Sequence, residues 1–406
     1  MPVRRSYFLS HRSPLVVESS ASGPRRSLLV VTEPLVSADS SHFKFVVSVA
    51  SVLAPSFEIS IGTTFLAPDA RLALHAKGFG TLEIRKARFF LNSILAVLGL
   101  ESEATFWTEA WLREALFTVN SKLFRHALRN AHFDCTLNVA STVVTPCDLW
   151  WILGPPLDVT LASAIPRRPG LGPLRRAVCS LVGSLERKLA LRIHSSTRKV
   201  VAGSNYVRDL YLSRGFSVDG TVFGIPDLSA FRPSAQKSEA RFVLAYIGKE
   251  VELDTLAALA GSGIKVVGFG NKLVPGIDPK RLRKFLDFRG AVTRDQLIDL
   301  YSNAEFTAFP FTSEGLGLVP LESMACGTPV LTYGREGPSE TMIDGETGWL
   351  VRDQNEFLQR AIQLWHGFDK SQFRARALNR ASQFTPAGQA RRLEGFILNG
   401  SNRPDA

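Results

Sequence analysis

Short apolar runs alternate with longer amphipathic segments along most of this chain, and the alternation limits the folds that it can adopt. Apolar runs bounded by charged residues, glycine or proline are typical of buried strands. They lie at Ser27–Thr32, Phe57–Gly62, Leu149–Leu153, Val200–Gly203, Phe242–Ile247, Lys265–Gly268, Phe306–Phe309 and Pro329–Thr332. Helical patterns lie between them, at Ser41–Leu53, Leu72–Leu98 with a break near Gly78–Gly80, Ser102–Asn130, Ser204–Tyr211, Leu253–Ala260 and Arg294–Asn303. Because alternating strands and helices form parallel sheets covered by helices on both faces, the pattern predicts an α/β, doubly wound protein.

The length of the chain favours two such sheets. Its 406 residues exceed what one hydrophobic core usually supports, and the turn-forming sequence at Gly224–Asp227 separates two units. We predict an N-terminal Rossmann-like domain at residues 1–215 and a C-terminal Rossmann-like domain at residues 216–385. Residues 386–406 are expected to form a terminal helix or tail that could return to the first domain.

Several protein classes do not fit this sequence. The four cysteines form no Cys-x-x-Cys pair, which argues against a disulfide scaffold or a structural zinc site and favours a reducing compartment. The longest nearly uncharged apolar stretch, Phe89–Leu100, is shorter than the roughly 20 residues of a membrane-spanning helix. Residues 1–26 lack the apolar block of a secretory leader. We therefore expect a soluble, cytoplasmic protein.

The excess positive charge belongs to the first half of the chain. The net charge is +11, and residues 216–406 are balanced, so residues 1–215 carry the whole excess. Arg167–Lys199 holds nine basic residues and a single acidic one, Glu186, on an apolar pattern with helical spacing. Such a helix could lie on an anionic membrane, on the inner face of the cell membrane, or it could pack on its own domain. Both interpretations stay open. Nucleic acid is not an expected partner, because no RNA-binding or helix-turn-helix motif accompanies the charge.

The densest group of functional residue types lies between Phe309 and Val330. The strand that ends at Phe309 is followed by a glycine-containing loop, and Pro320 suits the first position of the next helix. Gly327 suits the end of that helix, and Pro329 prevents its continuation. Glu314 is then expected in the loop and Glu322 in the first helical turn, at the strand end where doubly wound folds bind ligands.

The loop could receive an anion. Backbone amides at Gly315–Leu318, together with the helix N-terminus, could bind a diphosphate, and two nearby carboxylates suit sugar hydroxyls. Simpler interpretations remain. Glu322 could be a first-turn residue favoured by the helix dipole. It could also belong to a capping box, but the candidate N-cap, Val319, lacks the hydroxyl that this motif requires. Glu314 could be an ordinary loop carboxylate.

These residues resemble a known family. Glu314 and Glu322 stand in the Glu-x7-Glu arrangement of glycosyltransferase family 4, retaining enzymes of the GT-B fold, also grouped as group 1 glycosyltransferases. The resemblance extends over about Val200–Val351 and includes three further segments: Val200–Tyr211, Phe288–Ala304 and Gly337–Val351. Residues 1–199 match only in their rhythm of strands and helices.

The resemblance implies a nucleotide-sugar donor held by the second domain. It assigns Glu314 to hydroxyls of the transferred sugar, Glu322 to the ribose, and the amides of Gly315, Leu316, Gly317 and Leu318 to the sugar or diphosphate. Val292 belongs to the donor side. Of the family's basic pair after the first strand of this domain only Lys249 is present, and Lys272 is a candidate for the second cation. No metal or other cofactor is expected, because cations and a helix dipole can neutralise a diphosphate.

The first domain departs further from the family pattern. The loop after its first strand has no glycine pair and offers Ser40, Ser41 and His42, although Ser40 could simply cap the next helix. A histidine that often lies near the reacting sugar has no counterpart in Trp150–Pro156. Trp151 could stack on a sugar or lipid, but buried structural tryptophans are commoner.

The sequence thus predicts a transferase that moves a sugar from a nucleotide-diphosphate sugar to a glycan or polyprenyl-linked acceptor, keeping the anomeric configuration. Two alternatives remain. A non-catalytic relative could serve as a binding or scaffold subunit, and a nucleotide-sugar epimerase could use the same two-domain fold.

Overall fold

The computed structural model describes residues 25–83, 103–157, 159, 172–236, 238, 240–248, 251–270 and 282–400. The first domain contains β1 (Arg26–Thr32), α1 (Ser41–Leu53), β2 (Phe57–Thr63), α2 (Pro68–Ala76), β3 (Gly80–Glu83), α4 (Glu103–Phe117), α5 (Val119–Ala127), β4 (Cys135–Asn138), β5 (Cys147–Ile152), α7 (Gly172–Ser195), β6 (Thr197–Ala202), α8 (Asn205–Ser213) and β7 (Gly220–Thr221).

The strands of the first domain form one parallel sheet in the order β3-β2-β1-β4-β5-β6-β7. Helix α1 packs against one face through Phe43, Val46 and Val49, because these apolar positions recur at helical spacing. The strand order reverses direction between β1 and β4, so the carboxyl ends of these two strands define the switch point of this sheet.

The second domain repeats the architecture. It contains β8 (Val243–Tyr246), α9 (Leu253–Gly261), β9 (Val266–Phe269), β10 (Asp287–Phe288), α11 (Arg294–Asn303), β11 (Thr307–Phe309), α12 (Leu318–Ala325), β12 (Val330–Tyr333), α13 (Pro338–Thr341), β13 (Gly348–Val351), α14 (Gln354–His366) and α15 (Ser371–Ser382). Its strands, also parallel, follow the order β10-β9-β8-β11-β12-β13. The switch point lies between β8 and β11. The doubly wound α/β prediction is therefore confirmed.

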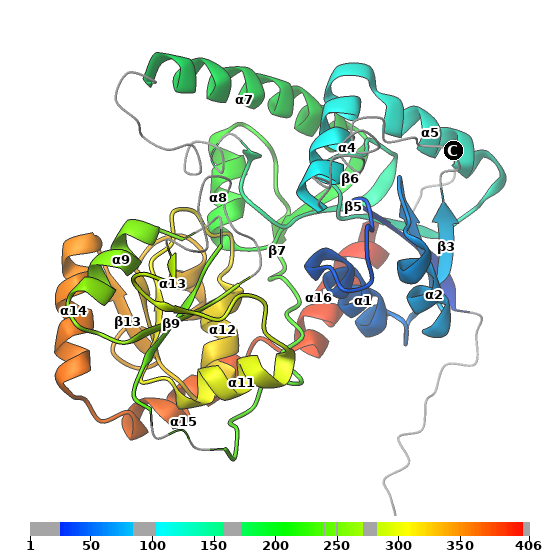
Figure 1. Ribbon diagram of the computed structural model, residues 1–406. Coiled ribbons are helices and arrows are strands. Elements are labelled where there is room, and N and C mark those ends of the chain that lie inside the picture. Colours follow the sequence, from blue (N-terminus) through cyan, green and yellow to red (C-terminus); the bar gives the residue numbers. More distant parts are fainter. Residues whose placement is uncertain are drawn as a thin grey trace, which may run out of the picture.

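The last helix, α16 (Pro386–Gly400), leaves the second domain and packs on the first. Figure 1 shows it as the red helix that runs from α15 toward α1. Its residues Leu393 and Ile397 are buried in the core of the first domain with Trp151 and Val222. The first sheet also includes β7, so the first domain extends beyond the expected boundary at residue 215.

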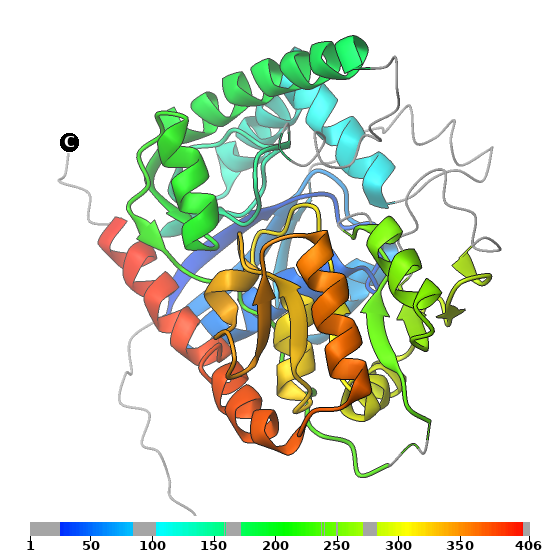
Figure 2. The same cartoon turned by 90° about the vertical axis from the view of Figure 1, so that its left-hand side faces the viewer.

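The basic segment Arg167–Lys199 is described from residue 172 onward, where α7 covers most of it. Leu189 and Ile193 of α7 are buried with Trp111 of α4, and Arg192 forms an ion pair with the buried Glu114 at 3.0 Å. This half of the helix packs on its own domain, while Leu181 is 63% exposed. Figure 2 shows α7 along the outer edge of the first domain. Among the described residues, no helix is long and apolar enough to span a membrane.

One expected helix proves to be two. The sequence pattern at Ser102–Asn130 predicts a continuous helix, but Thr118 has φ of 57° and separates α4 from α5. Strand β4 was not expected at all, because its four residues include the polar Thr136 and Asn138. The second difference reflects a tertiary contact: Asn138 is buried at the strand end, where its amide donates to the carbonyl of Val143.

Candidate functional site

The loop between β11 and α12 lies at the switch point of the second sheet. Strand β11 ends at Phe309, and an isolated bridge joins Phe311 to Val251, which follows β8. Helix α12 begins at Leu318, because Gly317 adopts φ of 92° as its N-cap. The expectation that Pro320 opens the helix was wrong. Glu322 consequently lies beyond the first turn, and the interpretation as a residue favoured by the helix dipole fails with it.

Glu314 is held in this loop by contacts at both its backbone and its side chain. Its carboxylate accepts hydrogen bonds from the amides of Leu316 and Gly317, each at 3.2 Å. Two of the amides assigned to the donor therefore face Glu314 in this structure. At 3.2 Å these contacts are at the long end of the N–H···O range, so a ligand anion could compete for the same amides.

A second loop, after β12, supports the first. The Glu336 carboxylate accepts the backbone amide of Glu314 at 2.7 Å, and the Gly337 amide donates to the Glu314 carbonyl at 3.1 Å. Glu336 has φ of 56°, a backbone conformation that residues other than glycine rarely adopt. Burial raises the pKa of Glu336, while the Glu314 amide and Arg335 oppose that rise. Two loops thus share one hydrogen-bonded unit around Glu314.

Glu322 is half-buried on the inner side of α12. Burial raises the pKa of its carboxyl to about 7, and the hydrogen bond from Tyr301 and the charge of Arg294 act in the opposite direction. The Tyr301 hydroxyl donates to Oε2 of Glu322 at 2.9 Å. Val292 is half-buried and packs on the aromatic cluster that contains Tyr301 and Phe269. Glu322 and Val292 therefore flank the same cluster.

The two cations expected on the donor side, Lys249 and Lys272, lie outside the described residues. Gly248 and Val251 are the nearest described residues on either side of Lys249. They follow the carboxyl end of β8, and the bridge from Val251 to Phe311 places them beside the loop of Glu314.

The first domain contacts this loop directly. A Cβ built on Gly315 would lie 3.4 Å from the carbonyl oxygen of Leu153 and 3.4 Å from Cδ of Pro155. Gly315 thus faces the loop that follows β5. A second contact joins Glu340 of α13 to the N-terminus of α8: its carboxylate accepts the amides of Asn205 at 2.8 Å and Tyr206 at 2.6 Å. An acidic side chain at a helix N-terminus is stabilised by the dipole, so Glu340 fastens one domain to the other.

The residues expected on the acceptor side have different roles. Ser40 caps α1 by accepting the amide of Phe43 at 3.1 Å, which is the capping interpretation. Ser41 is the first residue of α1, and His42 is half-buried with Nε2 2.8 Å from Oγ1 of Thr32. The suggestion that Trp151 stacks on a sugar or lipid was wrong. Its side chain has no exposed surface, and its indole N–H donates to the carbonyl of Val222 at 2.9 Å. It belongs to the core and cannot stack on a ligand there.

Sequence reasoning missed Glu33, at the switch point of the first sheet. Its buried carboxylate accepts the Ser141 amide at 2.7 Å, the Ser141 hydroxyl at 3.0 Å and the Thr142 hydroxyl. Burial raises its pKa, and these hydrogen bonds oppose the rise. Its partners are more than a hundred positions away in the chain, so only the pairing of β1 with β4 reveals the cluster. A carboxyl directly after a buried strand was the available signal.

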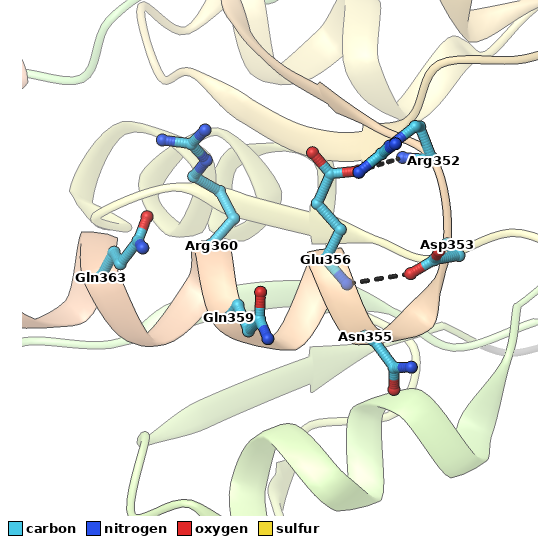
Figure 3. Close-up of a pocket in the computed structure, with 7 residues that line it drawn as sticks. All are labelled: Arg352, Asp353, Asn355, Glu356, Gln359, Arg360 and Gln363. Carbon is cyan, nitrogen blue, oxygen red and sulfur yellow. Dashed lines mark hydrogen bonds and ion pairs between the residues drawn. The ribbon is translucent and has the colours of Figure 1, made fainter.

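A surface pocket of ≈ 290 Å³ lies elsewhere, at the start of α14 (Figure 3). Its lining is Arg352, Asp353, Asn355, Glu356, Gln359, Arg360 and Gln363. Arg352, just before the N-cap of α14, has a side chain that is 87% exposed and pairs with Glu356 at 2.9 Å. The pocket includes neither Glu314 nor Glu322, and the contacts drawn in it join only Arg352, Asp353 and Glu356.

Comparison with solved structures shows what the two domains form together. HepE of Anabaena, solved in complex with UDP and glucose, superposes with a TM-score of 0.64 at 12% identity, covering 92% of this chain and 100% of that one. Sucrose-phosphate synthase of Thermosynechococcus elongatus gives 0.65 at 16% identity, covering 92% and 99%. The chain has the GT-B fold. At these identities, the similarity establishes the GT-B architecture alone.

A family model and curated relatives also match parts of this GT-B protein. Residues 271–367 match the family model described as "Glycosyl transferases group 1". The D-inositol 3-phosphate glycosyltransferase of Mycobacteroides abscessus is 32% identical over 149 residues, 33% of this chain and 34% of that protein. The alpha-1,3/1,6-mannosyltransferase alg-2 of Neurospora crassa is 46% identical over 57 residues, 14% of this chain and 12% of that protein. The matches thus span about a third or less of the length of these relatives.

Proposed function

We propose that this GT-B protein is a glycosyltransferase that moves a sugar from a nucleotide-diphosphate sugar to an acceptor hydroxyl. One observation carries the proposal: Glu314 and Glu322 stand on the loop and helix at the switch point of the second sheet, within residues that match the group 1 family model. This is where a doubly wound sheet binds its ligand. HepE, which shares the fold, was solved with UDP-glucose, and a nucleotide sugar is the corresponding donor here.

The proposed roles follow from the contacts of each carboxylate. Glu314 is fixed by the amides of Leu316 and Gly317 and would orient hydroxyls of the transferred sugar. Glu322, half-buried against Tyr301, would accept the ribose hydroxyls. Lys249, Lys272 and the amides of residues 315–318 would neutralise the diphosphate, so the proposal includes no metal.

In the reaction, the bond between the anomeric carbon and the diphosphate oxygen breaks, and a bond to the acceptor oxygen forms. The nucleoside diphosphate leaves with the electron pair of the broken bond, and one of its phosphate oxygens would take the proton that the acceptor hydroxyl loses. Retention of the anomeric configuration and a hexose as the transferred sugar are parts of the proposal taken from the family resemblance. Closure of the two domains would exclude water from the reacting sugar.

The acceptor would enter from the first domain. Its positive charge and the exposed part of α7 favour a glycan on a polyprenyl phosphate or another anionic lipid, on the cytoplasmic side of a membrane. Flotation with vesicles of phosphatidylglycerol and phosphatidylcholine at low and high salt tests this part. Binding that disappears at high salt would support it, and the absence of binding at low salt would remove it.

Calorimetric titration with UDP, GDP and ADP, beside Glu322→Ala, tests the donor site. Binding of one nucleotide, weakened in the variant by about tenfold or more because a charged hydrogen-bond partner is lost, would support the proposal. If a folded sample bound no nucleotide, the proposal would fail and the non-catalytic alternative would replace it. Conversion of the donor sugar without any acceptor would instead indicate the epimerase.

A further inference from the structure

Arg335 lies at the same edge of the second sheet as Glu314 and is absent from the roles given above. It follows β12 after one glycine, and its neighbour Glu336 accepts the backbone amide of Glu314 at 2.7 Å. Strand β12 pairs with β11, so Arg335 and the loop of Glu314 emerge side by side from adjacent strand ends.

The guanidinium of Arg335 is held in one place by its surroundings. It lies over the ring of Tyr333, 4.5 Å from the centroid, and 5.4 Å from the centroid of Phe311. Its Nη2 donates to the carbonyl of Phe311 at 3.0 Å and lies 3.6 Å from Oε1 of Glu252. A planar group fixed by aromatic rings on its face presents its N–H groups at its edge.

Most of the hydrogen-bonding capacity of Arg335 is not used within the described part of the chain. Both polar contacts involve Nη2, and among the described residues neither Nε nor Nη1 has a partner. The side chain is 43% exposed. A guanidinium offers five donors in a fork that matches two oxygens of a phosphate.

Arg335 lies close enough to the first domain for its charge to act there. Its charge acts on Glu336 and also on Tyr206 of α8, which belongs to the first domain. Tyr206 in turn donates its backbone amide to Glu340, the residue that joins α13 to α8. Arg335 therefore lies between the donor loop and the first domain, where the reacting part of a nucleotide sugar would be.

We propose that Arg335 binds a phosphate of the donor diphosphate and stabilises the negative charge of the leaving nucleotide. The assignment rests on the proposed function, because it names a ligand for the same site. An ion pair with Glu252 at 3.6 Å is too long to be a strong charge-assisted hydrogen bond, so a phosphate can replace it at small cost.

The chain offers a closely matched control for this assignment. Arg241 lies 4.5 Å from the ring centroid of Trp365, pairs with Glu305 at 3.2 Å, and has a side chain that is 44% exposed. It precedes β8 and so lies at the amino ends of the strands, opposite to the donor loop at their carboxyl ends. Arg241→Gln therefore removes one positive charge, one cation–π contact and one ion pair, which are the same kinds of interaction that Arg335→Gln removes, but at a position away from the donor loop.

The experiment measures binding of UDP, GDP and ADP, of the matching nucleosides and of inorganic pyrophosphate, by calorimetry. For the nucleotide that binds the wild type, Arg335→Gln is expected to weaken diphosphate binding by about tenfold or more. The affinity of Arg335→Gln for pyrophosphate should fall in parallel, whereas its affinity for the nucleoside should change less than twofold. Arg241→Gln should bind the diphosphate with an affinity within twofold of the wild type. Arg335→Lys should recover part of the loss, since a point charge replaces a fork.

The possible failures are distinguishable. If the wild type binds a nucleoside diphosphate and Arg335→Gln binds it equally well, the proposed function stands and the role of Arg335 is refuted. Equal weakening of the nucleoside and the diphosphate would also refute it, because Arg335 would then only support the loop. If the wild type binds no nucleotide, both proposals fail. Thermal unfolding of each variant shows that the fold is intact.

Discussion

Tyr301, which has no exposed surface, donates its hydroxyl to the carboxylate of Glu322 at 2.9 Å. The ring lies in an aromatic cluster with Phe231 and Phe269. The carboxylate on α12 is thereby oriented from α11, a separate helix. The hydrogen bond also favours the ionised form of Glu322, against the burial that raises its pKa to about 7.

The first prediction concerns Tyr301→Phe. Loss of the hydroxyl removes a contact that lowers the pKa of Glu322, so that pKa should rise further above about 7. Nucleotide binding at pH 7 should weaken and should recover near pH 9, where the carboxyl is ionised again. Calorimetric titration at both pH values checks this. Tyr333→Phe removes a hydroxyl that donates to Glu252 at 2.5 Å, and it should leave the pH dependence unchanged.

The second prediction concerns stability as a function of pH, measured without ligand. The folded pKa of Glu322, about 7, lies above its ordinary value of 4.5, so ionisation is disfavoured in the folded state. Its contribution to stability is therefore complete below pH 4.5 and is lost as the pH rises to 7. Relative to Glu322→Gln, the wild type should lose about 3 kcal/mol of unfolding free energy between pH 4 and pH 8. Denaturant unfolding at the two pH values measures this, and parallel behaviour of the two proteins would contradict it.

The third prediction concerns Gly337→Ala. A Cβ at Gly337 would lie 2.4 Å from both N and Cα of Leu316 and 2.5 Å from the carbonyl carbon of Gly315. Since backbone cannot yield as a side chain can, we expect a loss of about 1–3 kcal/mol in unfolding free energy and weaker nucleotide binding. Gly261→Ala is the control, because a Cβ there meets no atom within 4 Å. Equal stability of the two variants would refute the close approach of the two loops.

The fourth prediction concerns the contact between domains. Glu340→Ala leaves the amides of Asn205 and Tyr206 without their acceptor, which should cost about 1 kcal/mol, as for a lost helix cap. The two domains should also separate more readily, which small-angle X-ray scattering would detect as a larger radius of gyration. Glu346→Ala, at an exposed position near Gly345, should change neither quantity. An unchanged radius in Glu340→Ala would show that other contacts hold the domains together.

The fifth prediction concerns transfer itself. With the true substrates, Glu314→Ala should abolish most turnover, because it removes the group proposed to orient the sugar, while the protein stays folded. A Leu318→Ala variant is a useful comparison, since Leu318 is 48% exposed at the start of α12 and contributes only its backbone amide. Turnover of Glu314→Ala close to that of Leu318→Ala would show that Glu314 has another role.

The sequence predicts local structure well where one signal dominates. Ser41–Leu53 is a helix with the bounds that its periodicity and Ser40 indicate. The start of α12 was wrong because its N-cap, Gly317, acts through backbone conformation and carries no side chain to reveal it. Trp151 was ambiguous because an aromatic residue suits both a ligand and a core. The partnerships of Glu340 with α8 and of Glu33 with Ser141 follow only from strand order and domain packing, which local patterns do not encode.

The path of α16 has a mechanical consequence. The chain passes from the first domain to the second after β7, and it returns between α15 and α16, where Leu393 and Ile397 enter the first core. These two chain connections between the domains define an axis that passes through both of them. We therefore expect any domain motion to be a rotation about that axis rather than sliding or twisting, so that closure would return Gly315 to its place opposite Leu153.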